Sequence, residues 1–301
     1  MWITMHNGGL KMKHGIFYAF WEKQWAADYC YYVDKVARLG FDVLEIGCAP
    51  LPDYTQDQVN ELKKHAEDHN IILSGGYGPT PDHNIASKDP AVVAQATDWY
   101  RRLFEKMGML DMHMLCGAIY SYWPFDFSHC DPKEEEWKRS LEGIRVLADY
   151  AKPYNIVLGM ETINRFESYL LNTAEESTRF VKEVGKDNVK VHLDTFHMNI
   201  EEDDIGAAIR HAGEYLGHLH TGESNRKTPG HGHLPWHEIG QALHDIHYDG
   251  MVVMEPFVSM GGQVGQDIKV WRDLCNNATE EELDEDARRA CEFQRFMLDW
   301  K

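Results

Sequence analysis

Four short apolar segments in the second half of the sequence each run directly into an ionisable side chain. The pairs are residues 156–160 with Glu161, 189–193 with Asp194, 216–219 with His220 and 251–254 with Glu255. Three carboxylates held close together repel one another and raise each other's pKa values unless a cation neutralises them. If the four segments are parallel strands, their ends meet at one rim, and the four side chains are candidate ligands of a divalent metal ion.

These side chains make an oxygen-rich ligand set of three carboxylates and one imidazole. Such a set suits Mn²⁺, Co²⁺ or Mg²⁺ with open coordination positions better than a closed thiolate zinc site, and the sequence does not choose among the three ions. Each residue alone has an ordinary explanation, because a strand-end acid often caps the next helix and a single histidine often packs in a core. Their shared position favours the metal site. His231 and His233, in a glycine- and proline-rich loop, are expected to be exposed and outside it.

The elements that must position these groups alternate between strand-like and helix-like patterns. Expected strands are residues 15–20, 41–46, 71–77, 112–118, 156–160, 189–193, 216–219 and 251–254. Expected helices are residues 27–39, 56–69, 91–107, 135–150, 174–184, 205–212 and 236–244, with a closing amphipathic helix at 284–300. Thr173 and Asp203 are expected to be helix N-caps, and Gly40, Gly185 and Gly250 lie where a helix gives way to the next strand.

Eight such units without a domain-sized polar linker predict an α/β fold, a single (β/α)₈ TIM barrel over residues 12–301. Residues 1–11 have no clear period and precede a second methionine, Met12, so they are expected to be a poorly ordered N-terminal extension. An open doubly wound sheet is the structural competitor, but no G-x-G-x-x-G turn follows the first expected strand. Functional groups of a barrel come from the C-terminal strand ends, as the four candidate ligands do.

The composition bounds the classes of partner. The 301 residues include 30 Lys and Arg against 49 Asp and Glu, a formal charge of −19, which argues against nucleic acid. No apolar stretch approaches the roughly 20 residues of a membrane span, and no basic segment followed by a long apolar one resembles a secretory signal. A cytoplasmic location without membrane partners is expected. The cysteines form no C-x-x-C pair and are expected to be reduced thiols: Cys30, Cys48, Cys116, Cys130, Cys275 and Cys291.

Longer motifs around these positions carry a family resemblance. They are MKHGIFYAFW (12–21), YSYWP (120–124), METINRFE (160–167), LDTFHMN (193–199), GHLHTGESNR (217–226), VMEPF (253–257) and VSMGGQVGQDIKVWRD (258–273). In this order, over nearly everything after Met12, they resemble the D-tagatose 3-epimerase and D-psicose (D-allulose) 3-epimerase family, which is similar in fold to xylose isomerase. The resemblance implies an isomerase that interconverts free ketohexoses (D-fructose/D-psicose, D-tagatose/D-sorbose), with one Mn²⁺ or Co²⁺ per subunit, in a homodimer or homotetramer.

The resemblance assigns the metal ligands to the same four residues, Glu161, Asp194, His220 and Glu255. Inverting a carbon next to a carbonyl requires removing a proton from one face and returning one to the other. Two carboxylates that flank the substrate, here Glu161 and Glu255, can alternate as general base and general acid. A metal ion that holds the oxygens on carbons 2 and 3 would stabilise the charge of the cis-enediolate.

The resemblance further implies a set of substrate contacts. Glu167, His197 and Arg226 would hold the sugar near its carbonyl end, and Phe17, Trp123 and Phe257 would form an apolar wall. Phe17 departs from the tyrosine that is commoner in psicose-type members, which leaves the preferred ketohexose open. The ordinary alternatives are that Arg226 is a solvated loop cation, that Glu167 pairs with Arg165 on the rim, and that the aromatic residues only pack.

Three other functions remain open at this stage. Fold and metal site do not fix chemistry, so an aldose-ketose isomerase or an inosose-type dehydratase would use the same scaffold. A barrel related to apurinic-site endonucleases would present clustered histidines and a basic face, unlike this acidic chain. A non-catalytic sugar-binding barrel would show no epimerisation, and replacing Glu161 or Glu255 would not weaken its sugar binding.

Overall fold

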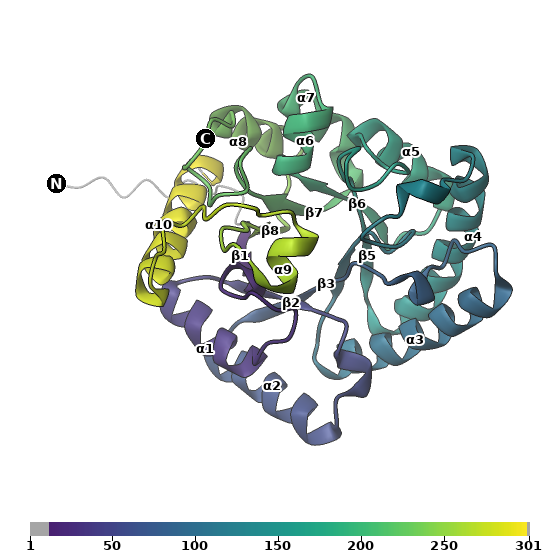
Figure 1. Cartoon of the computed structure of the whole chain (residues 1–301), viewed down its shortest axis with the longest axis horizontal. Helices are drawn as coiled ribbons and strands as arrows, with labels where there is room; N and C mark the ends of the chain where they lie inside the picture. The colour runs from purple at the N-terminus through teal and green to yellow at the C-terminus, as the bar shows by residue number, and fades with distance from the viewer. Residues whose placement is uncertain (1–11, 300–301) are drawn as a thin grey trace.

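All eight apolar segments form strands in the computed structural model, which describes residues 12–299 (Figure 1). The strands are β1 (Lys13–Phe17), β2 (Val43–Gly47), β3 (Ile72–Gly76), β4 (Met114–Gly117), β5 (Val157–Glu161), β6 (Val189–Asp194), β7 (Leu216–Thr221) and β8 (Met251–Met254). Each strand pairs in parallel with the next, and β1 pairs with β8, which closes the barrel. The predicted fold class is therefore confirmed, and the open sheet is wrong.

Most helices surround the barrel in the connections between strands, while two follow β8, and the first of these two lies over the middle of the barrel (Figure 1). They are α1 (Tyr29–Leu39), α2 (Gln56–His69), α3 (Pro90–Met109), α4 (Lys133–Ala151), α5 (Ala174–Val184), α6 (Thr195–Glu201), α7 (Ile205–Ala212), α8 (Trp236–Asp245), α9 (Gly262–Asp267) and α10 (Glu280–Leu298). The sequence predicts all of these except α6 and α9, which span about two turns and are too short to carry a periodic pattern. None of the described helices is long and apolar enough to cross a membrane.

Local signals set most element ends. The Thr173 side chain accepts a hydrogen bond from the backbone of α5, and left-handed glycines end α1 at Gly40 (φ 87°) and α5 at Gly185 (φ 70°). The prediction of Asp203 as the cap of α7 is wrong by one residue. The N-cap is Asp204, whose side chain accepts a hydrogen bond from the backbone N–H of Ala207 at 2.8 Å. An N-cap side chain bonds the amide two or three residues further along, and Asp204 has this spacing.

Three further predictions concern Gly250, the N-terminal residues and the cysteines. Gly250 directly precedes β8, but the preceding helix α8 already ends at Asp245, with Ile246 as its C-cap. The expected extension, residues 1–11, lies outside the described residues, so the domain boundary at residue 12 stays a prediction. All six cysteines have free thiols.

The interior of the barrel is unusually polar. Inward positions of such barrels are mostly filled by valine, isoleucine and leucine. Here Glu45, Ser74, Cys116, His192 and His218 are wholly buried on β2, β3, β4, β6 and β7. This layer lies directly beneath the strand ends that carry the candidate ligands.

Candidate active site

The structure brings the four strand-end side chains together at one rim of the barrel. Glu161 and Asp194 are the last residues of β5 and β6, His220 is the penultimate residue of β7, and Glu255 directly follows β8. One ligand atom from each lies within 4.8 Å of the others. Asp194 and His220 are buried, and the two glutamates are half-buried. The parallel strands therefore bring these four side chains together, as the sequence predicts.

Two features of this group fit a divalent cation. Nδ1 of His220 is buried without a hydrogen-bond partner among the described residues, and it faces Glu161 Oε1 at 4.0 Å and Glu255 Oε1 at 3.7 Å. Burial raises the pKa of Glu161 well above its usual range, and the Glu255 carboxylate raises it further. Burial also raises the pKa of Glu255 to about 7, although nearby cationic groups oppose it. A dication would satisfy the imidazole nitrogen and offset the repulsion between the carboxylates.

Arg226 lies within the carboxylate group. Its Nη1 donates to Glu255 Oε2 at 3.1 Å and to Asp194 Oδ2 at 3.3 Å, and its guanidinium carbon lies 3.9 Å from the ring centre of Phe196. The backbone at Arg226 is left-handed (φ 63°) and donates to Glu223 O, which forms a tight turn after β7. The side chain is only 8% exposed, so the alternative of a solvated loop cation is wrong.

His197, on α6, presents one ring nitrogen to the site. Its Nδ1 accepts from the backbone N of Asn164 at 3.3 Å and lies 2.7 Å from the Asn164 amide nitrogen. Nε2 lies 3.8 Å from Glu161 Oε1 and 3.7 Å from Asp194 Oδ2. Burial lowers the pKa of His197, although neighbouring carboxylates oppose it. Because Nδ1 is the acceptor, the neutral ring carries its proton on Nε2, which faces the pocket and lies 3.5 Å from Arg226 Nη2.

Glu167 contacts Asn164 and Trp123 and does not pair with Arg165. Asn164 Nδ2 donates to Glu167 Oε1 at 3.1 Å, and Trp123 Nε1 donates to Oε2 at 3.3 Å. Arg165 instead donates to Glu201 through Nη2 at 2.7 Å, so the alternative pairing is wrong. Burial opposes the charged form of Glu167, yet the neighbouring imidazole and guanidinium lower its pKa overall. Glu167 is therefore an ionised acceptor at the edge of the site.

Aromatic side chains form the other wall of the pocket. Phe17 and Phe257 pack edge to face with ring centres 6.2 Å apart. Trp25 lies 6.3 Å from both Trp123 and Phe257, measured between ring centres. Every residue that the sequence analysis placed in the site lines this pocket except Asp194, which is buried behind it.

Three residues of the site escape the sequence analysis. Trp25 lies in the loop after β1, where no pattern marks it, and its Nε1 donates to Asp267 of α9 at 2.8 Å. Gly78 makes room for the Trp123 indole, because a Cβ there would lie 2.9 Å from Cε3. Glu45 Oε1 lies 2.6 Å from His220 Nε2, and an acid inside the apolar segment VLEIG was the signal available for it.

The closed barrel and the carboxylate-rich site define the class of xylose isomerase-like TIM barrels, and the model of that family matches residues 33–274. Nearer relatives narrow this class. The chain is 54% identical over 288 residues to a D-psicose 3-epimerase of Ruminiclostridium cellulolyticum, covering 96% of this chain and 98% of that protein. It is 51% identical over 287 residues to a D-psicose 3-epimerase of Agrobacterium fabrum, covering 95% and 99%.

A solved structure agrees with these relatives. A crystal structure of a D-psicose 3-epimerase from Clostridium cellulolyticum with D-tagatose matches with a TM-score of 0.95 and 54% identity, covering 96% of this chain and 100% of that one. The chain therefore belongs to the D-psicose 3-epimerase family of isomerases. The family resemblance seen in the sequence is confirmed.

Proposed function

We propose that this protein is a ketose 3-epimerase that interconverts free ketohexoses, D-fructose with D-psicose or D-tagatose with D-sorbose. The observation that carries the proposal is the half-buried pair Glu161 and Glu255, whose carboxylate oxygens lie within 4.8 Å of one another at the mouth of a barrel of the D-psicose 3-epimerase family. Because the named relatives act as epimerases, an aldose-ketose isomerase and a dehydratase are less well supported. The expected homodimer or homotetramer stays a prediction.

Glu161, Asp194, His220 and Glu255 would hold one divalent cation, with Mn²⁺ or Co²⁺ as the expected ions and Mg²⁺ as a further candidate. When bound, such an ion supplies Lewis-acid stabilisation of negative charge on the sugar oxygens next to the reacting carbon. Arg226 adds a fixed positive charge against Asp194 and Glu255 from within the chain.

The two glutamates would carry the proton transfers. One carboxylate takes the proton from carbon 3, and the electron pair of that C–H bond forms the double bond between carbons 2 and 3 while the carbonyl oxygen becomes negative. The other carboxyl group returns a proton to carbon 3 on the opposite face, and the carbonyl at carbon 2 forms again. Burial raises the pKa of both glutamates, and the Glu255 carboxylate raises that of Glu161 further, which keeps them basic enough to accept a proton beside a cation.

The remaining pocket residues would orient the sugar. The Nε2–H of His197 and the guanidinium of Arg226 are donors for oxygens near the carbonyl, and the ionised Glu167 is an acceptor for a hydroxyl. Phe17 and Phe257, together with Trp123, offer apolar surface to the C–H groups of the sugar.

Product analysis in D₂O tests the proposal. The purified protein, with added Mn²⁺ or Co²⁺, is incubated with D-fructose or D-tagatose and followed by NMR. The expected product is the carbon 3 epimer with deuterium at carbon 3, and metal removal by a chelator should abolish it. Deuterium at carbon 1 with conversion to an aldose would contradict the proposal and identify an aldose-ketose isomerase. Turnover of either kind would eliminate the non-catalytic sugar-binding barrel.

A further inference from the structure

The carboxylate of Glu45, on β2, is wholly buried inside the barrel and takes no part in the reaction described above. Its contacts cross the interior to β7, which is not a neighbour of β2 in the sheet. Oε1 lies 2.6 Å from His220 Nε2, and Oε2 lies 3.0 Å from His218 Nε2. A buried charge of this kind costs several kcal/mol unless donors compensate it, so its presence calls for an explanation.

Hydrogen-bond donors surround this carboxylate. Ser74 Oγ donates to Oε2 at 2.9 Å, and the Cys116 thiol approaches the same oxygen at 3.5 Å. Oε1 faces the ring nitrogen of His220 and Oε2 accepts from Ser74, so each carboxylate oxygen has a donor, as an ionised carboxylate requires. Glu45 is therefore an anion that accepts hydrogen bonds, and it is not itself a donor.

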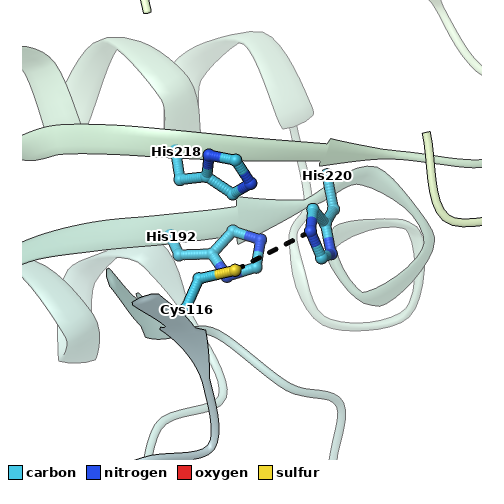
Figure 2. Close-up of side chains that lie close together, drawn as sticks. All are labelled: Cys116, His192, His218 and His220. Carbon is cyan, nitrogen blue, oxygen red and sulfur yellow. Dashed lines mark hydrogen bonds between the residues drawn. The ribbon is translucent and has the colours of Figure 1, made fainter. Parts of the chain in front are cut away.

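The same layer contains side chains that resemble a soft-metal site. Cys116, His192, His218 and His220 point toward one another from β4, β6 and β7 (Figure 2), and their ligand atoms lie within 4.8 Å of one another. The Cys116 thiol, however, lies 3.4 Å from Gly75 O and 3.5 Å from Glu45 Oε2, two acceptors that favour a protonated thiol over a metal-binding thiolate. The layer is thus better explained as the surroundings of Glu45 and His220. The His192 ring packs edge to face against His220 with ring centres 4.1 Å apart, which restricts its rotation.

The contact with Glu45 determines which nitrogen of His220 is free. Since Glu45 is an anion, Nε2 of His220 must carry the proton of their hydrogen bond. The other nitrogen, Nδ1, then offers its lone pair toward Glu161 and Glu255, where it has no hydrogen-bond partner in the described part of the chain. When a cation displaces any proton from Nδ1, the imidazole held in this way is a neutral ligand whose orientation is fixed from behind.

We propose that Glu45 is a positioning residue, which holds the Nε2–H of His220 and thereby presents Nδ1 of His220 to the divalent cation. The inference rests on the proposed function, because it takes the strand-end residues as the ligands. Carboxylates that hydrogen-bond a ligating histidine fix its tautomer and raise its basicity, and their loss weakens metal affinity by about 10- to 100-fold.

Metal titration separates this role from a general effect on folding. Metal-stripped wild type, Glu45→Gln and Glu136→Gln are titrated with Mn²⁺ by calorimetry, and thermal unfolding of each metal-free protein is recorded. Glu136 is a matched control, because it is also a buried carboxylate and accepts from the hydroxyls of Ser121 and Tyr169, away from the four ligands. Glu45→Gln should raise the Kd by about 10- to 100-fold, and Glu136→Gln should leave it within about threefold. Equal Kd values for wild type and Glu45→Gln would overturn the inference.

A second readout does not depend on a folded variant. In a crystal structure of the Mn²⁺-loaded wild type, we expect His220 to ligate through Nδ1 while Nε2 keeps its contact with Glu45. Ligation through Nε2, or a broken contact with Glu45, would overturn the inference. If the wild type binds Mn²⁺ and epimerises the sugar, and Glu45→Gln binds Mn²⁺ equally tightly, only this inference is contradicted. Wild type that binds neither Mn²⁺ nor Co²⁺ contradicts the proposed function as well.

Discussion

The two halves of the barrel contribute different kinds of side chain to one pocket. Strands β5 to β8 supply the acidic and imidazole groups at their ends, Glu161, Asp194, His220 and Glu255. Strands β1 to β4 and the loops after them supply mostly apolar or small residues, among them Phe17, Gly76, Gly117 and Trp123. Phe257, just after β8, completes the apolar wall from the other half. A sugar in the pocket would therefore meet reactive groups that come only from β5 to β8, and an apolar wall that comes mainly from β1 to β4.

Placing the acidic groups in the β5 to β8 half is unfavourable, and a residue of the β1 to β4 half helps to offset this. Gathering three carboxylates and an imidazole on four consecutive strands raises the pKa of Glu161 and of Glu255, because burial and neighbouring carboxylates disfavour their charged forms. Arg226 offsets the repulsion from within the same half, and Glu45 reaches across the interior to orient His220 from the opposite half. If this comparison is right, changes in the β5 to β8 half should affect chemistry most, and changes in the apolar wall should affect selectivity.

The largest expected effect comes from the paired glutamates. Glu161→Gln and Glu255→Gln should each lower kcat for carbon 3 epimerisation by about 10²- to 10⁴-fold, because an amide cannot take or return the proton. Initial rates at saturating metal measure this loss. Glu201→Gln is the control, since this carboxylate pairs with Arg165 on the rim and should keep its activity. Near-normal turnover in either variant of the pair would remove that residue from the chemistry.

Arg226 should have the next largest effect. Arg226→Gln leaves Asp194 and Glu255 without their guanidinium partner, and breaking a buried ion pair costs about 3 to 5 kcal/mol. We expect a lower Tm of the metal-free protein and a loss of about 10²-fold in kcat/KM. Arg165→Gln removes a guanidinium that is itself exposed, and it should lower the stability less than Arg226→Gln does. If Arg226→Gln and Arg165→Gln lower the Tm and kcat/KM equally, the burial of Arg226 contributes to neither stability nor activity.

The pH dependence of the metal-free protein sharpens the account of Glu255. Its folded pKa of about 7 exceeds the unfolded value near 4.5, so the folded state binds the proton more tightly. Its contribution to stability is therefore present below about pH 4.5 and lost as the pH rises through about 7. Because the ion must displace this proton, the affinity for Mn²⁺ should rise by up to about tenfold per pH unit below that pKa. A pH-independent Kd measured by calorimetry would contradict the assignment.

The smallest expected effect lies in the apolar wall. Phe17→Tyr adds one hydroxyl to the pocket, and a single neutral hydrogen bond contributes about 0.5 to 1.5 kcal/mol. The ratio of kcat/KM for D-psicose over D-tagatose should change by about two- to tenfold, while the Kd for Mn²⁺ stays the same. A large change in metal affinity would contradict the separation between the two halves.

The sequence predicts the elements better than the contacts between them. The alternation of strand and helix patterns predicts the barrel. It also predicts that the strand-end ligands lie at one rim, because the C-terminal ends of parallel strands meet there. Glu45 lies in an apolar segment, from which its burial can be predicted but its hydrogen-bond partner cannot. That partner, His220, is 175 positions away in the sequence and contacts Glu45 only in the closed barrel. Trp25 and the turn that directs Arg226 inward depend on loop geometry, which carries no periodic signal.

The central claim is that two carboxyl groups, and not one, exchange protons with carbon 3 from opposite faces. The most direct test is the deuterium content at carbon 3 at early times in D₂O, compared between the product and the remaining substrate. The account predicts that the first product formed carries solvent deuterium at carbon 3, because the returning proton comes from a different carboxyl group. A product that keeps the original hydrogen at carbon 3 would show that one base serves both faces and would contradict the account.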